Sequence, residues 1–299
     1  MDRLLLSSVD LKALLFAPST PMNRTLAGKV AVVAGASRGV GRGVAHELGA
    51  AGATVYVTGR SRRGGPTTDG LPGTIDDTAD LVTEAGGRGL AVACDHTDDA
   101  QIAALAERVR DEQGGLDLLV NCAWGGYEQY DASLFGLPVW EQPLWRWDTM
   151  FASVRAAYAT TRALLPLMLD RSGALIANVS AGDDGKFLGD VQYDGAKAAV
   201  ERLTFGLAHK LNRHGIAVVT VQPGFTWTER VAAEAPAEAR AQTHTPEFVG
   251  RAVLALYTDP NVMGRSGGAY KAGQLGLAYG FTDVDGSQPA PFVIPEQEG

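Results

Sequence analysis

Cysteine and histidine, which often build disulfide frameworks and metal sites, are scarce in this chain. Its 299 residues include two cysteines, Cys94 and Cys122, and five scattered histidines with no HxxxH pattern. So few cysteines exclude a disulfide scaffold and are typical of a reducing compartment. We place the two thiols at the ends of different strands, and neither residue type shows the spacing of a metal site, so we expect no bound metal.

Long apolar runs and an excess of basic residues are also missing. No apolar stretch reaches the roughly 18 residues of a membrane span, so none is predicted. The net charge is −8, whereas non-specific binding to nucleic acid or to anionic lipid needs a basic surface. We therefore expect neither partner, and the composition favours a cytoplasmic protein.

Residues 1–25 are predicted to be an extension, either a surface helix or a disordered segment. Leucines from Leu4 to Leu15 could form a short amphipathic helix, but Asp2, Asp10 and the lack of a small-residue cleavage site argue against a signal peptide. Met22, just ahead of the first predicted strand, could itself be the natural start. We expect one folded domain over residues 26–299.

Short apolar segments alternate with helical ones along this domain. The predicted strands are Lys29–Ala34, Thr54–Thr58, Gly89–Cys94, Leu116–Val120, Ala174–Val179, Ile216–Val221 and Gly268–Lys271, separated by helices Arg42–Ala51, Thr74–Ala85, Asp98–Glu112, Trp147–Leu169, Val191–Arg213 and Pro246–Tyr257. Nearly continuous apolar strands are typical of a parallel sheet buried on both faces. The sequence thus predicts a Rossmann-like, doubly wound α/β domain with strand order 3-2-1-4-5-6-7 and ligands at the carboxyl ends of the strands.

Two long segments, Trp124–Arg146 and Phe225–Thr245, interrupt the alternation at that ligand end. The first carries the aromatic residues Trp124, Tyr127, Tyr130, Phe135, Trp140 and Trp145. Long loops of this kind are usually functional lids or disordered segments. We expect a lid that covers the substrate, with a structural flap or a contact between subunits as alternatives.

The first strand runs into Gly35-Ala36-Ser37-Arg38-Gly39-Val40-Gly41 and then a helix. Glycines there allow a tight turn and a close backbone approach to a pyrophosphate, and the helix N-terminus favours an anion. The second strand ends in Gly59-Arg60 with no acidic residue for the ribose hydroxyls. Arg60 and Arg38 could pair with a 2′-phosphate instead, which predicts NADP(H) rather than NAD(H).

Tyr193 and Lys197 lie four residues apart near the start of a predicted helix, and so on one face. A neighbouring ammonium should lower the pKa of the phenol and make Tyr193 an acid or base near neutral pH. Ser180 ends the preceding strand, where its hydroxyl could polarise a substrate oxygen in the same pocket.

From about Leu26 to Lys271 the chain resembles the short-chain dehydrogenase/reductase family. The matching residues are Gly35-x3-Gly39-x-Gly41, Asp95, Asn121-Cys122-Ala123, Ser180, Tyr193-x3-Lys197 and Pro223-Gly224-x3-Thr228. The insertion before the Trp147 helix and the segments Thr245–Phe248, Thr258–Asn261 and Tyr279–Gly286 resemble one branch of that family.

The resemblance implies Tyr193 as the proton donor, Ser180 as the partner of the substrate carbonyl and Lys197 as the holder of the nicotinamide ribose. It implies that Asp95 contacts the adenine, Thr228 the nicotinamide amide, and that Asn121 and Ala123 line the groove through their backbone. The cofactor-binding set that we predict is Gly35, Ser37, Arg38, Gly39, Val40, Gly41, Arg60, Asp95, His96, Asn121, Ala123, Tyr193, Lys197, Pro223, Gly224, Thr226 and Thr228.

Two positions depart from the family pattern. Trp124 stands where a glycine is usual, and the family's catalytic asparagine, part of a water-linked proton path, is replaced by Ser153, or by Val154 in the other alignment.

The residues favour an NADP(H)-dependent oxidoreductase that interconverts a carbonyl and an alcohol, with reduction of a hydrophobic ketone or aldehyde expected. The missing asparagine leaves an NADP(H)-binding regulatory protein as the alternative. The resemblance also implies a homodimer or homotetramer.

Overall fold

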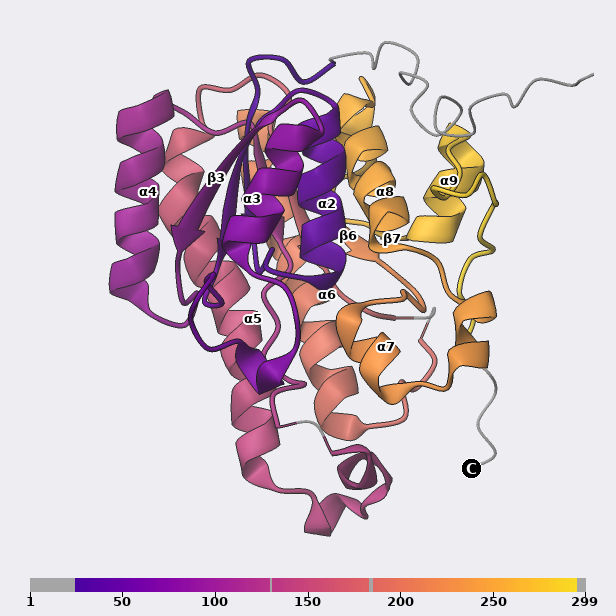
Figure 1. Ribbon diagram of the computed structural model, residues 1–299. Coiled ribbons are helices and arrows are strands. Elements are labelled where there is room, and N and C mark those ends of the chain that lie inside the picture. The colour runs from indigo at the N-terminus through magenta and orange to yellow at the C-terminus, as the bar shows by residue number, and fades with distance from the viewer. Residues whose placement is uncertain (1–24, 130, 183–184, 295–299) are drawn as a thin grey trace, which may run out of the picture.

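The protein is described here by a computed structural model that covers residues 25–129, 131–182 and 185–294. Apart from Thr25, the predicted extension lies outside these residues, as does Tyr130 of the insertion. A seven-stranded sheet forms the centre of the molecule (Figure 1). Its strands are β1 (Val30–Ala34), β2 (Thr54–Gly59), β3 (Arg88–Ala93), β4 (Leu118–Asn121), β5 (Leu175–Val179), β6 (Ala217–Gln222) and β7 (Ala269–Lys271).

The spatial order is β3-β2-β1-β4-β5-β6-β7, and every pairing is parallel. This confirms the predicted fold and strand order. Cys94 and Cys122 follow β3 and β4, which β2 and β1 separate, and both thiols are free as predicted.

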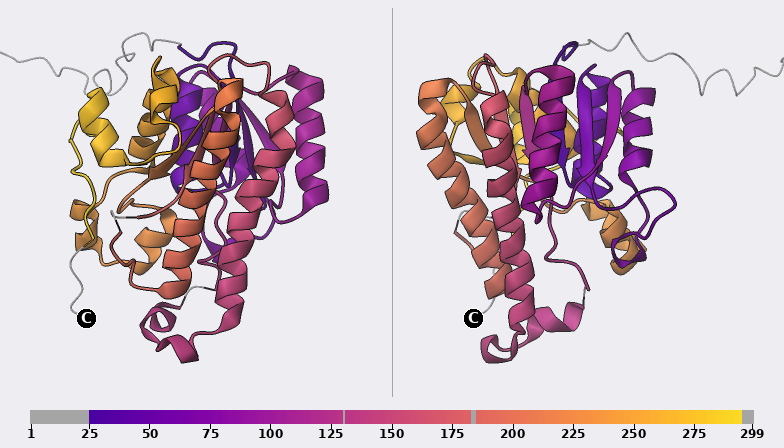
Figure 2. Two further views of the ribbon diagram at one scale, coloured as in Figure 1. Left: turned by 180° about the vertical axis from the view of Figure 1, so that it is seen from behind. Right: turned by 90° about the vertical axis from the view of Figure 1, so that its left-hand side faces the viewer.

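Helices cover both faces of the sheet, as the apolar strands require. On one face lie α2 (Gly39–Ala50), α3 (Ile75–Glu84) and α8 (Pro246–Thr258), and on the other lie α4 (Asp99–Gln113), α5 (Leu144–Leu164) and α6 (Val191–Leu211), which are nearest the viewer when the molecule is seen from behind (Figure 2). Successive residues of β1 enter different cores: Ala31 and Val33 pack with α2 and α8, whereas Val30 and Val32 pack with α4 and α5. Two separate apolar cores therefore fix the sheet between its helices.

Backbone approaches backbone where α2 crosses α8. A Cβ atom at Gly43 would lie 2.2 Å from the carbonyl carbon of Pro246, and one at Gly250 would lie 2.6 Å from the carbonyl oxygen of Gly43. Both distances are too short for a side chain. This close packing fixes the position of α2, whose N-terminus begins the ligand end of the sheet.

The two irregular segments contain more helix than the sequence suggested. The insertion holds two short helical turns, η2 (Ala132–Gly136) and η3 (Val139–Glu141), and α5 begins at Leu144, three residues before the predicted start. The Phe225–Thr245 segment holds α7 (Glu229–Glu234) and η6 (Ala237–Gln242). A further helix, α9 (Ala272–Tyr279), was not predicted. The insertion and α7 lie at the same end of the sheet (Figure 1).

Candidate active site

A cavity of about 1200 Å³ opens at the carboxyl ends of the strands. Its lining combines the glycine loop, the ends of β2 to β6, the insertion and α7. Among the residues predicted to bind cofactor or to act in catalysis, it includes Gly35, Ser37, Arg38, Gly39, Val40, Gly41, Arg60, Asp95, His96, Ala123, Ser180, Tyr193, Lys197, Pro223, Gly224, Thr226 and Thr228. The fold therefore brings together residues that are up to 193 positions apart in the chain, from Gly35 to Thr228.

The glycine loop presents the Gly39 N–H at the start of α2, where no residue of the helix itself accepts it. Gly39 has a left-handed backbone (φ 56°), and the N-cap residue Arg38 makes no side-chain capping bond. The Gly39 N–H instead donates 2.7 Å to the carboxylate of Glu229 on α7. Gly41 allows the loop to fold tightly, because a Cβ there would lie 2.3 Å from the Gly35 carbonyl oxygen. The loop is thus built to bind an anion with its backbone.

Arg38 and Arg60 line the cavity, but each already has partners. The guanidinium of Arg38 donates to the Pro72, Leu71 and Gly73 carbonyls and to the Ser61 hydroxyl. Arg60 forms an ion pair with Glu128 of the insertion and a 3.4 Å hydrogen bond to Thr68. Arg60 therefore links the end of β2 to the aromatic insertion.

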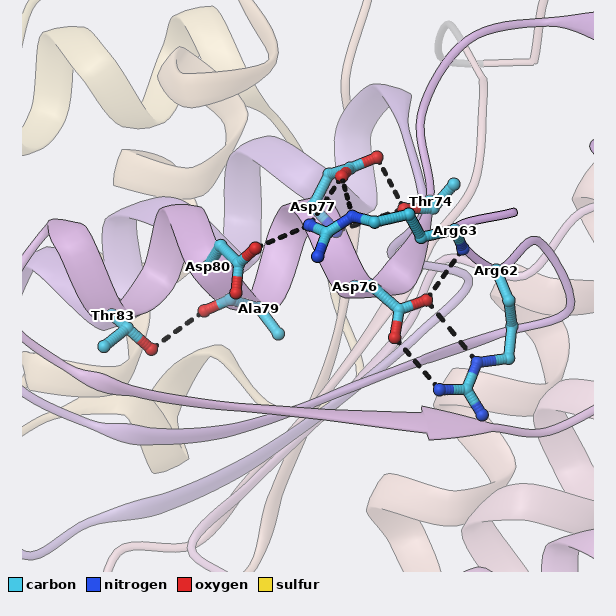
Figure 3. A network of polar contacts seen from close by, with 8 residues as sticks. All are labelled: Arg62, Arg63, Thr74, Asp76, Asp77, Ala79, Asp80 and Thr83. Atoms are coloured by element: carbon cyan, nitrogen blue, oxygen red, sulfur yellow. Dashed lines mark hydrogen bonds and ion pairs between the residues drawn. The ribbon is translucent and has the colours of Figure 1, made fainter. Parts of the chain in front are cut away.

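Arg62 and Arg63 point away from the cavity. Arg62 pairs with Asp76 at 3.0 Å, and Arg63 pairs with Asp77 and Asp80 (Figure 3). These carboxylates lie in the first two turns of α3, where negative charge also complements the helix dipole. The two arginines stabilise the loop before α3 and are not available as phosphate ligands in this arrangement.

Asp95 and His96 follow β3 and differ in exposure. The carboxylate of Asp95 accepts bonds from the Thr97 N–H and hydroxyl, at 2.9 and 2.7 Å, which hold the turn. The His96 ring is buried, with Thr58 and Thr160 hydroxyls each 2.8 Å from its nitrogens. Burial lowers the pKa of His96 to about 4, so the ring is neutral at physiological pH.

Asn121 is buried outside the cavity lining. Its side-chain amide donates to Asn178 at 2.8 Å and to Thr161 at 3.1 Å. The side chain thus crosslinks β4, β5 and α5. The buried hydroxyl of Thr226 also has a side-chain partner, since it lies 3.1 Å from Nε2 of His244.

Ser180 and Lys197 are joined by a hydrogen bond. Ser180 is buried at the end of β5, and its hydroxyl donates 2.9 Å to the carbonyl oxygen of Lys197 on α6. Asp190 caps α6 by accepting the Tyr193 N–H at 2.8 Å. Arg146 at the start of α5 forms a buried 3.0 Å ion pair with the same carboxylate. The insertion and α6 are therefore fixed to each other.

Burial sets the protonation of Tyr193 and Lys197. It raises the pKa of the Tyr193 phenol, although a hydrogen bond from Tyr127 opposes this, and it lowers the pKa of the Lys197 amine to about 7. The sequence had predicted a lowered phenol pKa. The direction is reversed because desolvation of the phenol outweighs the neighbouring amine, whose own charge is also disfavoured by burial.

Two aromatic rings, Trp124 and Tyr127, lie beside the Lys197 amine and the Tyr193 phenol. The Nζ of Lys197 lies 3.4 Å from the ring centroid of Trp124, and Trp124 meets Tyr193 edge-on at 5.8 Å. Tyr127 stacks on Tyr193 with centroids 5.9 Å apart. The start of the insertion therefore packs directly against the Tyr193 ring. A Cβ at Gly126 would lie 2.5 Å from Trp124 Cζ2, so the ring fills the space above Gly126.

Ser153 occupies the place that faces the site on α5. It lines the cavity, and its hydroxyl accepts the Gly125 N–H at 2.9 Å and donates to the Thr149 carbonyl at 3.2 Å. Val154, the other candidate for the missing asparagine, is not part of the lining. The hydroxyl supports the turn that carries Trp124.

Sequence reasoning missed a set of contacts across the mouth of the cavity. Asp69 of η1 (Thr68–Gly70) accepts the Gln129 N–H of the insertion at 3.2 Å and pairs with Arg230 of α7. Asp69 and Gln129 are also the non-glycine residues with positive φ in the described chain, 53° and 55°. Neither a motif nor a spacing identifies such contacts, because they join three loops that are distant in sequence.

Part of the insertion is exposed, whereas Phe135, also beyond Glu128, lines the cavity. Trp140 is 84% exposed, and Val139 and Leu144 are 61% and 76% exposed. The inner part, Trp124 to Glu128, lies in the cavity wall.

Of the helices that the structure describes, none is long and apolar enough to cross a membrane.

Comparison with known proteins agrees with this geometry. The family model for short chain dehydrogenases matches residues 29–239. Dehydrogenase/reductase SDR family member 1 of Mus musculus is 35% identical over 274 residues, which cover 87% of this chain and 84% of that relative. The chain thus resembles the branch of that relative, as the insertion and C-terminal segments predicted.

Solved structures of the family superpose well. A short chain dehydrogenase from Mycobacterium thermoresistibile has a TM-score of 0.76 at 28% identity, with 90% of this chain and 94% of that chain covered. A metagenomic short-chain oxidoreductase in complex with NADP has a TM-score of 0.62 at 29% identity, with 79% and 94% covered. Motifs, topology and similarity together show that this chain belongs to the short-chain dehydrogenase/reductase family of oxidoreductases.

Proposed function

We propose that the protein is an NADP(H)-dependent enzyme that reduces a hydrophobic ketone or aldehyde to the alcohol. The observation that carries this proposal is the convergence of Ser180, Tyr193 and Lys197 with the anion-binding N–H of Gly39 in one cavity. Hydride chemistry needs a nucleotide site and a proton donor next to each other, and this cavity supplies both.

The cavity suits a dinucleotide phosphate. The Gly39 N–H already holds a carboxylate, so the same donor can hold a pyrophosphate oxygen. Arg60 and Arg38 lie at the end of β2 and in the glycine loop, where guanidinium groups would pair with a 2′-phosphate. A family member of known structure, 29% identical, binds NADP. These features support NADP(H) over NAD(H).

The bound cofactor would supply the hydride, and the side chains of this chain would supply the proton and the orientation. Tyr193 would donate its phenolic proton to the carbonyl oxygen as the C–H bond forms, which gives the neutral alcohol. Ser180 would donate a hydrogen bond to the same oxygen after its hydroxyl rotates from the Lys197 carbonyl. Lys197 would stabilise the resulting tyrosinate and bind the ribose.

Apolar side chains support a hydrophobic substrate. Around Tyr193 the lining includes Tyr127, Leu188, Phe225 and Phe292. Partially exposed aromatic walls favour substrates with rings or long alkyl groups. Consumption of NADPH with a panel of ketones and aldehydes of increasing size tests this, and the proposal predicts that kcat/KM rises with apolar area.

An NADP(H)-binding regulatory protein is the second candidate. The observation in its favour is Ser153, whose hydroxyl is committed to Gly125 and Thr149 where the family has a proton-relaying asparagine. Tight NADPH binding without turnover on any member of the panel would select this candidate.

Assembly and compartment form a further part of the proposal. Tyr158 on α5 and Phe205 on α6 are 49% and 50% exposed, which supports burial against a second copy in a homodimer or homotetramer. The two free cysteines support a cytoplasmic location. Light scattering and fractionation test these points separately.

A further inference from the structure

Lys197 is a buried amine whose environment has no opposite charge. Among the described residues its Nζ has no carboxylate partner and no hydrogen-bond acceptor, and the residue is 7% exposed. The titratable groups that face it are the Cys122 thiol from β4 and the Tyr193 phenol from its own helix. Burial raises the pKa of Cys122 to about 12 and that of Tyr193 as well, so both groups are neutral.

The face of Trp124 is the closest stabilising contact of this amine. The Nζ lies 3.4 Å from the indole centroid, compared with 5.3 Å from the Tyr193 centroid. A ring face carries partial negative charge, and its attraction for a cation is strongest for tryptophan and in sites without water. The indole N–H of Trp124 is buried with no partner in the described structure, and as a donor it cannot bind an ammonium, so the contact is made by the ring face.

The indole is fixed from α5 and cannot easily turn away. The Gly125 N–H, next to Trp124 in the chain, donates to Ser153, and Met150 and Trp124 both lie against Gly126. The ring edge also packs on Tyr193 at an interplanar angle of 89°. One side chain thus touches both the amine and the phenol.

We propose that Trp124 is a positioning residue that holds the Lys197 ammonium by a cation–π contact and keeps it beside Tyr193. Its meaning for catalysis rests on the proposed function, but the contact itself exists in the cofactor-free protein and can be measured there. The ring face takes the place of the polar partner that a buried ammonium needs. Ser153 helps to hold Trp124 in position, because its hydroxyl accepts the N–H of the neighbouring Gly125.

The test is an NMR titration of the cofactor-free protein labelled with ¹³C at lysine Cε. The chain has six lysines, and Lys197→Met assigns the signal of interest. Trp124→Leu keeps an apolar side chain without a ring face, so the pKa of Lys197 should fall by about 0.5–1.5 units. Trp124→Phe keeps a weaker ring face and should lower the pKa by less. Trp147→Leu is the matched control, because Trp147 stacks on Phe151 and is not in the cavity lining.

An unchanged or raised pKa of Lys197 in folded Trp124→Leu overturns the proposal, because the ring would then only exclude water. If Trp124→Leu does not fold, Trp124→Phe alone is the test. A lower pKa of Lys197 in Trp124→Phe supports the contact, and an unchanged pKa overturns it. In a catalytically competent enzyme, the basic limb of the pH profile of kcat/KM should move in the same direction. A shift in the NMR titration without any turnover would uphold the contact and reject the proposed function.

Discussion

The carboxylate of Glu229 accepts a 2.7 Å hydrogen bond from the Gly39 N–H, at the point where the dinucleotide phosphates are proposed to bind. Arg42 on α2 lies 4.0 Å from the other oxygen of the same carboxylate. A negatively charged side chain therefore occupies the N-terminus of α2 in the cofactor-free protein. Because one N–H group cannot donate fully to two anions, a pyrophosphate oxygen bound there would compete with the Glu229 carboxylate for this hydrogen bond.

Glu229→Gln should bind NADPH more tightly than the unmodified protein, by about 2–5-fold, because the amide removes a charge that competes at the helix N-terminus. Fluorescence titration of NADPH measures this. Glu238→Gln, on exposed η6 and not in the cavity lining, is the matched control and should bind like the unmodified protein. Weaker binding by Glu229→Gln would mean that the carboxylate assists the cofactor instead of competing with it.

Arg60→Gln should weaken NADPH binding by about 10–100-fold, since one charge-assisted bond to a phosphate contributes about 1.5–3 kcal/mol. NADH binding should change little. Arg62→Gln provides the comparison, because Arg62 does not line the cavity, and it should leave both dissociation constants unchanged. Equal affinity of the unmodified protein for NADPH and NADH would contradict the cofactor assignment.

Tyr193→Phe should reduce kcat by about 10²–10⁴-fold, because the variant lacks the proton donor, and should leave NADPH affinity nearly intact. The exposed Tyr158 gives the control variant Tyr158→Phe, for which we expect unaltered rates. Single-turnover measurements with the best ketone of the panel make the comparison. Retention of most of the activity by Tyr193→Phe would exclude it as the acid.

Lys197→Met should inactivate the enzyme and raise the free energy of unfolding at pH 7 by about 1–3 kcal/mol. Burial lowers the pKa of the folded amine to about 7 from its ordinary value of 10.5, so between these pH values the unfolded chain binds the proton and the folded chain releases it. The stability of the unmodified protein should therefore rise with pH through this window. The difference in the free energy of unfolding between Lys197→Met and the unmodified protein should therefore shrink towards pH 10.

Urea unfolding at pH 7 and pH 10 measures this pair of stabilities. Lys210→Met, at the exposed end of α6, serves as the control and should show no comparable gain at either pH. If Lys197→Met is less stable than the unmodified protein at pH 7, the contacts of Lys197 in the fold must outweigh the cost of burying its amine.

The fold could be predicted because its determinants are local. Apolar strands such as Val30–Ala34 and the glycine loop after it specify a parallel sheet and its ligand end without knowledge of distant contacts. The sequence also placed Ser180 at a strand end and Tyr193 and Lys197 near the start of a helix, and the structure brings all three into the cavity lining.

The contacts that determine protonation could not be predicted. The pKa of Tyr193 depends on how completely the insertion buries it, and Trp124 contributes to that only after the chain folds back from β4. Glu229 and Asp69 act through loops that meet only in three dimensions. Similarly, α9 was missed because Ala272–Tyr279 follows directly on β7 without a turn signal.

The space between Trp124 and Gly126 has a consequence for evolution. Because a Cβ at residue 126 would lie 2.5 Å from the indole, an alanine there is incompatible with the ring in its present place. A tryptophan in this place at position 124 therefore requires glycine at position 126. We expect the two residues to vary together among relatives that enclose the lysine in this way.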